Sequence, residues 1–351
     1  MENVNYYNWH FFYSLIIMVK NSGKIISIVL FLFLISCDSN TNRLSINVED
    51  VEVGDVKIKR YAQALFAIDT ANLKAELEEL QPSFPVFLDG DLDDPYSLKR
   101  IEGFITDTFL IRVQKDCEAK YPDMTEVEES LKNAFKHYKY YYPEVKIPEV
   151  FTYVSGFDYE HKIQLYNNNI LIALDLYLGS DYPSYKQLGL AKYVFNKFSE
   201  EYLVRDCIYE ISHSYIDSHR VESALLDLMI YEGKMLWFVH ALIPDIKKEI
   251  LLGYTPEQLV WAKNNEAMVW AFIIENEMLY STDPVAKQKF IIDAPFTSFF
   301  GNDSPPRLGA WIGYQIVDNL MQTNKNISLP DLMNNYESQK ILKKSGFKPK
   351  M

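Results

Sequence analysis

The feature that most constrains the fold is a segment, residues 221–243, whose apolar side chains cover nearly the whole circumference of a helix. A helix that is apolar on all sides is buried inside a domain. Glu232 and Gly233 interrupt this segment near its middle. A buried carboxylate has to be paired, hydrogen-bonded or neutral. Glycine in a helix interior costs about 1 kcal/mol relative to alanine, so we expect another element to pack closely against Gly233.

A second helix, predicted over 307–323, has the features of a close neighbour. Gly309 and Gly313 are one helical turn apart and share one face, which allows another helix to approach closely. Arg307 stands at the start of this helix and is our candidate partner for a buried carboxylate. The alternative for Arg307 is a surface position near a helix N-terminus.

The remaining periodicity predicts an α+β fold, with a small antiparallel sheet followed by a mainly helical half. Alternating runs at 149–156, 161–166 and 170–178 predict an antiparallel meander, and a looser run at 51–59 predicts a further strand. Thr125 with Glu128, and Thr255 with Gln258, form capping boxes that predict helix starts. Helices are expected at about 69–80, 125–141, 188–200, 203–217, 221–243, 256–280, 307–323 and 329–343.

The N-terminal region has the pattern of a bacterial lipoprotein signal at 18–37. Lys20 and Lys24 form a basic region, the apolar run 25–35 is too short to span a bilayer, and an LISC box ends at Cys37. We expect Cys37 to begin the mature protein and to carry acyl chains. The alternative is an N-terminal membrane anchor with an incidental cysteine. Residues 1–17 are then a misassigned start or an extension, 38–50 a flexible tether, and 51–351 a single domain.

Charge and cysteine content narrow the functional classes. The 351 residues have a formal net charge of −13. This acidic net charge argues against nucleic-acid binding, which needs a basic patch, and against adsorption onto anionic lipid headgroups. The acyl chains on Cys37 are therefore the expected membrane attachment. Cys117 and Cys207 either pair in an oxidising compartment or remain two buried free thiols.

One segment has part of the pattern of a zinc peptidase. Such enzymes place two histidines one turn apart on a helix, with a glutamate beside the first and a third ligand on a later helix. Here the pattern reads YEISH, with Tyr209 in the place of the first histidine. Glu210, His213 and the later Glu232 are the candidate metal ligands. Three interpretations stay open: a zincin-like scaffold that binds and does not cut, a zinc hydrolase with a modified site, and a chance match.

Motifs along most of the mature chain resemble one protein family. They are the box at Cys37 and the stretches FAIDTANLKAELEELQPSFPVFL (66–88), LDLYLGSDYPSY (174–185), LLDLMIYEGKMLWFVHALIP (225–244), GYTPEQLVWAKNNEAMVWAFIIENEMLYSTD (253–283), APFTSFF (294–300) and PPRLGAWIGYQIV (306–317). In this order they are similar to GldB, the gliding-motility-associated lipoproteins of the Bacteroidetes. The resemblance implies a cell-envelope lipoprotein needed for gliding, with partners among envelope proteins of gliding and type IX secretion. It also implies a distant, zincin-like kinship.

Two functions agree with these patterns. The first is a lipid-anchored, non-enzymatic component that binds or stabilises another protein and needs no cofactor. The second is a lipid-anchored, zinc-dependent peptidase. We expect a binding groove where the helices at 203–217, 221–243 and 256–280 meet, with Glu232, Asn265, Glu266 and Arg307 in its polar lining. The lipid on Cys37 would hold the protein to a membrane of the cell envelope, either inner or outer.

Overall fold

Four short strands and a larger set of helices make up the part of the chain that this computed structural model describes, residues 43–217 and 224–350. The predicted α+β class is confirmed. The lipidation site predicted at Cys37 lies outside the described residues. All the elements belong to one unit, which begins at Ile46. They are β1 (Ile58–Arg60), α3 (Tyr61–Leu65), α4 (Leu73–Leu80), α5 (Pro95–Thr106), α6 (Thr108–Lys120), α7 (Thr125–Tyr141), β2 (Glu149–Tyr153), β3 (Ile163–Tyr166), β4 (Asn169–Ala173), α8 (Pro183–Gln187), α9 (Lys192–Phe195), α10 (Glu200–His213), α11 (Leu225–Leu242), α12 (Lys248–Leu252), α13 (Pro256–Glu275), α14 (Pro284–Phe290), α15 (Leu308–Thr323), α16 (Leu329–Met333) and α17 (Ser338–Ser345), with short 3-10 turns at 70–72, 159–161 and 174–176.

The sheet is mixed, with the strand order β1-β2-β4-β3. β1 pairs with β2 and β2 with β4 in parallel, and only β3 and β4 are antiparallel. The predicted antiparallel meander is therefore wrong, except for the hairpin that contains Asn167 and Asn168. The physical reason lies in burial: Ile170 and Ile172 of β4 are fully buried, so β4 takes an interior position between two neighbours. β3 is only partly buried and forms an edge.

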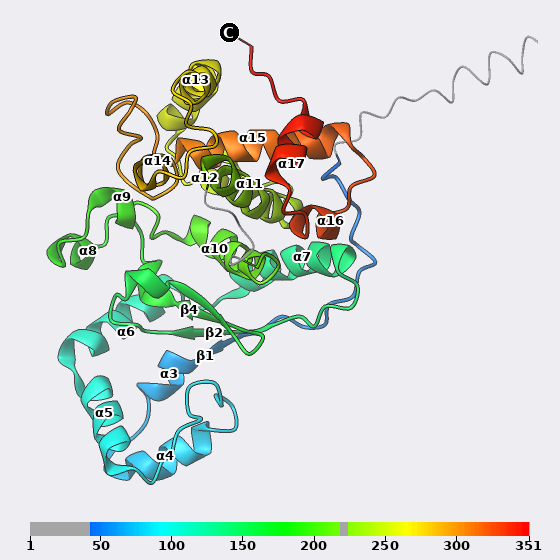
Figure 1. Cartoon of the computed structure of the whole chain (residues 1–351). Helices are drawn as coiled ribbons and strands as arrows, with labels where there is room; N and C mark the ends of the chain where they lie inside the picture. The colour runs from blue at the N-terminus through cyan, green and yellow to red at the C-terminus, as the bar shows by residue number, and fades with distance from the viewer. Residues whose placement is uncertain (1–42, 218–223, 351) are drawn as a thin grey trace, which may run out of the picture. The chain divides into compact units, whose positions relative to one another are not determined.

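Helices cover both sides of this sheet. In Figure 1, α3, α4 and α5 lie on one side of the strands, and α7 and α10 lie on the other. Contacts join α3 to β2 and α10 to β3. The helices α11 and α15 lie beyond α7 and α10, so the second half of the chain adds a further helical layer (Figure 1).

The predicted buried helix is α11, and its close neighbour is α15. Trp237 and Phe238 of α11 are fully buried. A Cβ atom added to Gly233 would lie 2.3 Å from the carbonyl carbon of Gly313, and one added to Gly313 would lie 1.7 Å from the carbonyl oxygen of Met229. No real side chain tolerates such distances, so glycine is required at both positions. The close approach that the sequence predicted at Gly233 is confirmed.

The predicted helix starts have two different outcomes. Thr255 caps α13 in a complete capping box with Gln258, as expected. α7 begins at Thr125 as predicted, but without a capping box. Glu128 instead accepts the backbone N–H of Ile58 at 2.9 Å and pairs with Lys57 at 2.8 Å. The carboxylate thus joins α7 to β1 and cannot reach back to its own helix terminus.

Several helical boundaries differ from expectation. α5 and α6 were not predicted; Asp94 and Asp107 cap them by accepting backbone N–H groups of the first turn. The helix expected at 188–200 is reduced to the short α9, and the one expected at 329–343 is divided into α16 and α17. Glycine at 189 has φ of +73°, which interrupts helical geometry between α8 and α9.

The two remaining cysteines are buried and unpaired. Cys117 lies in α6 and Cys207 in α10, and both are free thiols. Of the two alternatives that the sequence left open, the free pair is therefore the one found. Among the described residues, no helix combines the length and apolar character needed to cross a membrane.

Candidate functional site

The carboxylate of Glu232 lies at the centre of a polar cluster between three helices. Tyr209 of α10 donates its hydroxyl to Oε2 of Glu232 at 2.8 Å. Arg307, which precedes α15, donates to the same oxygen at 2.5 Å. The side chains of Glu232 and Arg307 are only 12% and 17% exposed. Arg307 is thus the partner that the sequence suggested for a carboxylate in the middle of an apolar helix.

Arg307 is held in an unusual backbone conformation. It is the N-cap residue of α15 and has φ of 53° and ψ of 40°, in the left-handed region that side-chain-bearing residues avoid. Its Nε donates to the carbonyl of Ile291 at 3.1 Å, while its own carbonyl accepts the hydroxyl of Tyr254 at 3.5 Å. Burial opposes the charge on the guanidinium, but Glu232 and Tyr209 outweigh it and raise the pKa of Arg307. Strained residues of this kind concentrate at functional sites.

Tyr209 is enclosed as well as hydrogen-bonded. The guanidinium of Arg205 lies 4.5 Å from the centre of the Tyr209 ring. Arg205 also donates to the carbonyl of Leu251 and pairs with Asp206 at 2.9 Å. Burial, together with the Glu232 charge, raises the pKa of Tyr209, so its hydroxyl stays protonated and donates. Tyr209 therefore serves as a hydrogen-bond donor to Glu232.

The other members of the YEISH segment have separate surroundings. His213 Nδ1 lies 3.0 Å from the hydroxyl of Tyr231, and desolvation lowers the pKa of His213. Desolvation raises the pKa of Glu210, whose carboxylate accepts a backbone hydrogen bond from Leu165 on β3. Within residues 43–217 and 224–350, no three His, Cys, Asp or Glu side chains are grouped closely enough to hold a metal ion. Glu210, His213 and Glu232 thus do not form such a group in this structure.

A polar cavity of about 520 Å³ lies beside this cluster. Pro306, the residue before Arg307, forms part of its wall, as does Tyr254. Lys197 and Asp293 form an ion pair of 2.7 Å in the same wall. Burial lowers the pKa of Lys197, and the Asp293 charge opposes this shift. The cavity has the size of a small-ligand or peptide-side-chain site.

Two predicted groove residues lie on α13. Asn265 donates its side-chain amide to the carbonyl of Trp261, one turn earlier, at 2.8 Å. Desolvation raises the pKa of Glu266. Among the described contacts, none joins either side chain to Glu232 or Arg307, and the groove lined by all four residues stays a prediction.

Sequence reasoning missed several residues of the cluster and of the cavity beside it. In the sequence, Tyr209 stands where a zinc peptidase has a histidine, which hides its role here, although a phenol near a buried carboxylate is itself a common donor. Lys197 and Asp293 are 96 residues apart, and no local pattern connects them. Arg205 directly follows the apolar pair Leu203 and Val204, which does not distinguish it from an ordinary surface arginine.

Comparisons with known proteins identify the family. A family model described as gliding motility protein GldB matches residues 41–349. No curated protein and no solved structure matches the chain. The zincin-like resemblance therefore has no matching structure behind it and stays a prediction. Since the family model covers most of the 351 residues, the chain belongs to the family of the gliding motility protein GldB.

Proposed function

We propose that the protein is a lipid-anchored component of the cell envelope that serves gliding motility by binding another protein, without catalysing a reaction. Membership of the GldB family supports a gliding-related lipoprotein. The LISC box supports attachment through Cys37. Because the resemblance to GldB implies gliding that is coupled to type IX secretion, we extend the proposal to partners in that machinery.

The observation that carries the non-catalytic part of the proposal is the state of Glu232. Its charge is compensated by Arg307 at 2.5 Å, and the same oxygen accepts the Tyr209 hydroxyl. A carboxylate held in this way is a poor metal ligand, since the guanidinium and the phenol hydroxyl already occupy its oxygen and fix its orientation. The cluster therefore favours a structural joint between α10, α11 and α15, next to a polar cavity that is available for binding.

Attachment is tested by replacing the cysteine of the LISC box. Cys37→Ala should move the protein from the membrane fraction to the soluble fraction and abolish gliding, because a doubly or triply acylated cysteine is a stable anchor. Cys117→Ala is the matched control, since Cys117 is buried and free and should leave fractionation unchanged. A Cys37→Ala protein that still sediments with membranes, in cells that still glide, would overturn the anchoring proposal.

Catalysis is tested by zinc content and casein cleavage of the purified protein. The proposal expects neither stoichiometric zinc nor cleavage. Zinc that is lost in His213→Ala, together with cleavage that is lost in the same variant, would support the peptidase alternative. Asp217→Ala is a suitable control, because Asp217 is also exposed and lies four positions after His213, beyond the end of α10.

Partner binding is tested by site-specific photo-crosslinking in living cells. A photo-reactive residue at Glu201, in the wall of the polar cavity, should form adducts with gliding or secretion proteins. The same residue at Val260, 57% exposed on α13 and outside that wall, is the control. Equal adducts from both positions would argue against the cavity as the binding site.

A further inference from the structure

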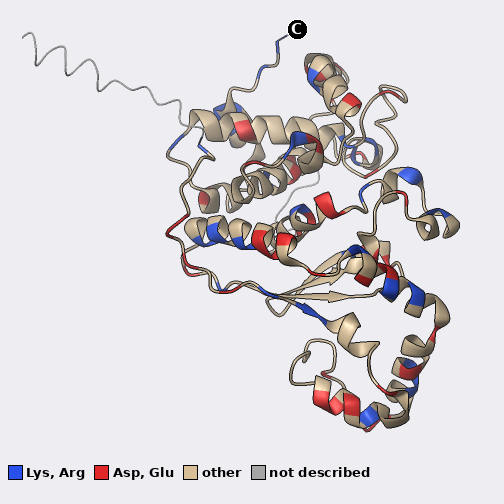
Figure 2. Cartoon of the chain, turned by 180° about the vertical axis from the view of Figure 1, so that it is seen from behind, with Lys and Arg blue, Asp and Glu red and all other residues tan. Residues whose placement is uncertain are grey.

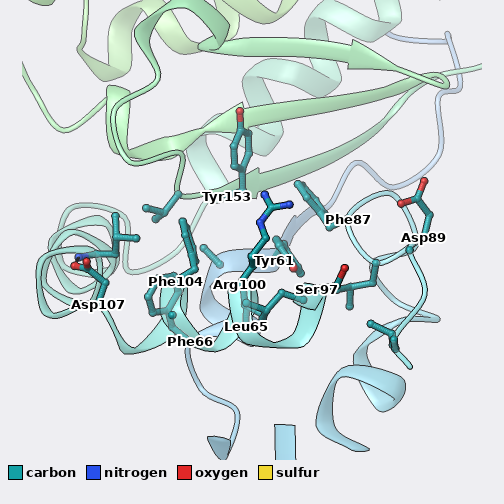
Figure 3. Close-up of a pocket in the computed structure, with 18 of the residues that line it drawn as sticks. Tyr61, Leu65, Phe66, Phe87, Asp89, Ser97, Arg100, Phe104, Asp107 and Tyr153 are labelled. Atoms are coloured by element: carbon teal, nitrogen blue, oxygen red, sulfur yellow. Dashed lines mark hydrogen bonds between the residues drawn. The ribbon is translucent and has the colours of Figure 1, made fainter. Parts of the chain in front are cut away.

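A second cavity, of about 650 Å³, lies among the N-terminal helices. Its walls come from α3, the loop 87–92, α5, the start of α6 and the end of β2. Figure 3 shows Tyr61, Phe66, Phe87 and Phe104 around the hollow. The size falls within the range of about 300–1,000 Å³ that is usual for ligand sites.

Aromatic contacts give this cavity firm walls. The rings of Tyr61 and Phe87 are stacked, with centroids 4.1 Å apart and planes only 3° from parallel. Phe87 also packs against Tyr153, with a centroid distance of 5.7 Å, and Phe66 packs against Phe104 at 5.6 Å. Each ring is thus held by a neighbouring ring, so the hollow is preformed and presents apolar surface.

Gly103 leaves one wall of the cavity without a side chain. It lies in α5 and lines the cavity, and a Cβ atom added there would meet nothing within 4 Å. Glycine within a helix is unfavourable relative to alanine. No contact in the described structure requires glycine at this position, unlike Gly233 and Gly313. The absent side chain widens the cavity.

Negative charge is concentrated in the segment that precedes α5 and forms one wall of the cavity. Residues 69–94 contain eight Asp or Glu residues and one lysine, Lys74, and so account for −7 of the chain's net −13. Figure 2 shows acidic residues gathered on α4 within this segment. Lys74 is already engaged by Glu78 and Asp93. Asp89 and Asp91 lie in the cavity wall itself.

Arg100 is the one basic residue of the cavity wall. Figure 3 shows its side chain extending from α5 toward Tyr153, between Phe104 and Phe87. In the described part of the chain, its guanidinium has neither an ion pair nor a hydrogen bond. Its five N–H donors can therefore bind carbonyl oxygens of an incoming backbone.

We propose that this cavity receives an apolar side chain from a segment of a partner protein, and that lysine or arginine residues flank that side chain in the segment. The aromatic walls bury the apolar group, Asp89 and Asp91 attract the flanking cations, and Arg100 binds main-chain carbonyls. The surrounding acids repel an anionic lipid or a small carboxylate, which makes a basic peptide the better occupant. This docking site is separate from the Glu232 cluster and goes beyond the proposed function, and a binding measurement tests it independently of gliding.

The test selects ligands from a displayed library of short random peptides against the full-length lipidated protein in a neutral detergent. We expect the enriched peptides to carry an aromatic or aliphatic residue flanked by Lys or Arg. Gly103→Leu should fill the hollow and lower the affinity for these peptides roughly tenfold to a hundredfold. This is the affinity expected from burying one apolar side chain. Thr106→Leu, on the same helix but outside the wall, is the matched control and should leave affinity unchanged.

A charge variant tests the second part of the proposal without filling the cavity. Asp89→Asn combined with Asp91→Asn should lower the affinity for the peptides roughly threefold to tenfold at low salt, and by less at high salt. Asparagine keeps the oxygen through which Asp91 accepts the N–H of Asp93. Failure to enrich any peptide, enrichment of acidic peptides, or equal binding to Gly103→Leu would overturn the proposal. Competition by neutral phosphatidylcholine vesicles would overturn it in favour of a lipid.

Discussion

Adding one methyl group at the contact between α11 and α15 tests how the helices of the second half of the chain pack together. In Gly313→Ala, the new Cβ would lie 1.7 Å from the carbonyl oxygen of Met229, although real Cβ atoms stay more than 3.0 Å from such an atom. The obstructing atom belongs to the backbone of α11 and cannot rotate away. The two helices would therefore have to separate by more than 1 Å, or one would have to bend.

The size of the effect follows from this geometry. Overpacking a core by one carbon usually costs about 1–3 kcal/mol, and a rigid obstacle places this variant at or above the upper end. The better helix propensity of alanine returns about 1 kcal/mol. Displacement of α15 also moves Arg307 away from Glu232. We expect the free energy of unfolding to fall by about 3 kcal/mol.

Urea unfolding, followed by tryptophan fluorescence and far-UV circular dichroism, measures this change. Gly103→Ala is the matched control, because its Cβ meets nothing within 4 Å. It should be about 0.5–1 kcal/mol more stable than the wild type. A Gly313→Ala protein with wild-type stability would refute the inference that α11 and α15 meet backbone to backbone.

Two further predictions concern buried ionisable side chains. Glu232→Gln should lower the free energy of unfolding by about 3 kcal/mol, because it leaves the Arg307 charge enclosed without its counter-ion, and adding Arg307→Met should restore part of the loss. Strict additivity of the two changes in a double-mutant cycle would contradict this coupling. Burial, and then the neighbouring Lys248, lower the pKa of His240 to about 3. The unfolded chain takes up that proton near pH 6.5 and the folded chain does not, so stability should fall between pH 6.5 and 3, by at most about 1.4 kcal/mol per pH unit. His240→Gln should make the measured slope shallower, and an unchanged slope would show that His240 is not buried in its neutral form.

Local patterns in the sequence predicted the parts of the fold that depend on local physics. The apolar circumference of 221–243 indicates a buried helix, and Gly233 indicates a close neighbour, which is α15. The same reasoning about an enclosed carboxylate led from Glu232 to Arg307, which stands at the start of the helix predicted to pack closely. The capping box at Thr255 was also recognisable, because its hydrogen bonds join residues only three positions apart.

The other parts of the fold and of the site depend on contacts between residues that are far apart in the sequence. The parallel pairing of β2 with β4 inserts β4 between two strands that are neighbours in sequence, and no alternation of side chains encodes that order. The hydrogen bond from Tyr209 to Glu232 joins two helices whose relative rotation is set by packing. The aromatic cavity was not anticipated for the same reason, because α5 was not predicted and Gly103 gave no local signal.

The two free cysteines determine that the fold needs no disulfide between them, and they provide two sites for thiol labelling. Because neither thiol is bonded to the other, formation of the described fold does not depend on a disulfide between them. Burial raises the pKa of Cys117 and Cys207, so both thiols resist alkylation while the fold is closed. Their labelling rates therefore report the opening of two separate helices, α6 and α10. The difference between the two rates would show which of these two helices opens first.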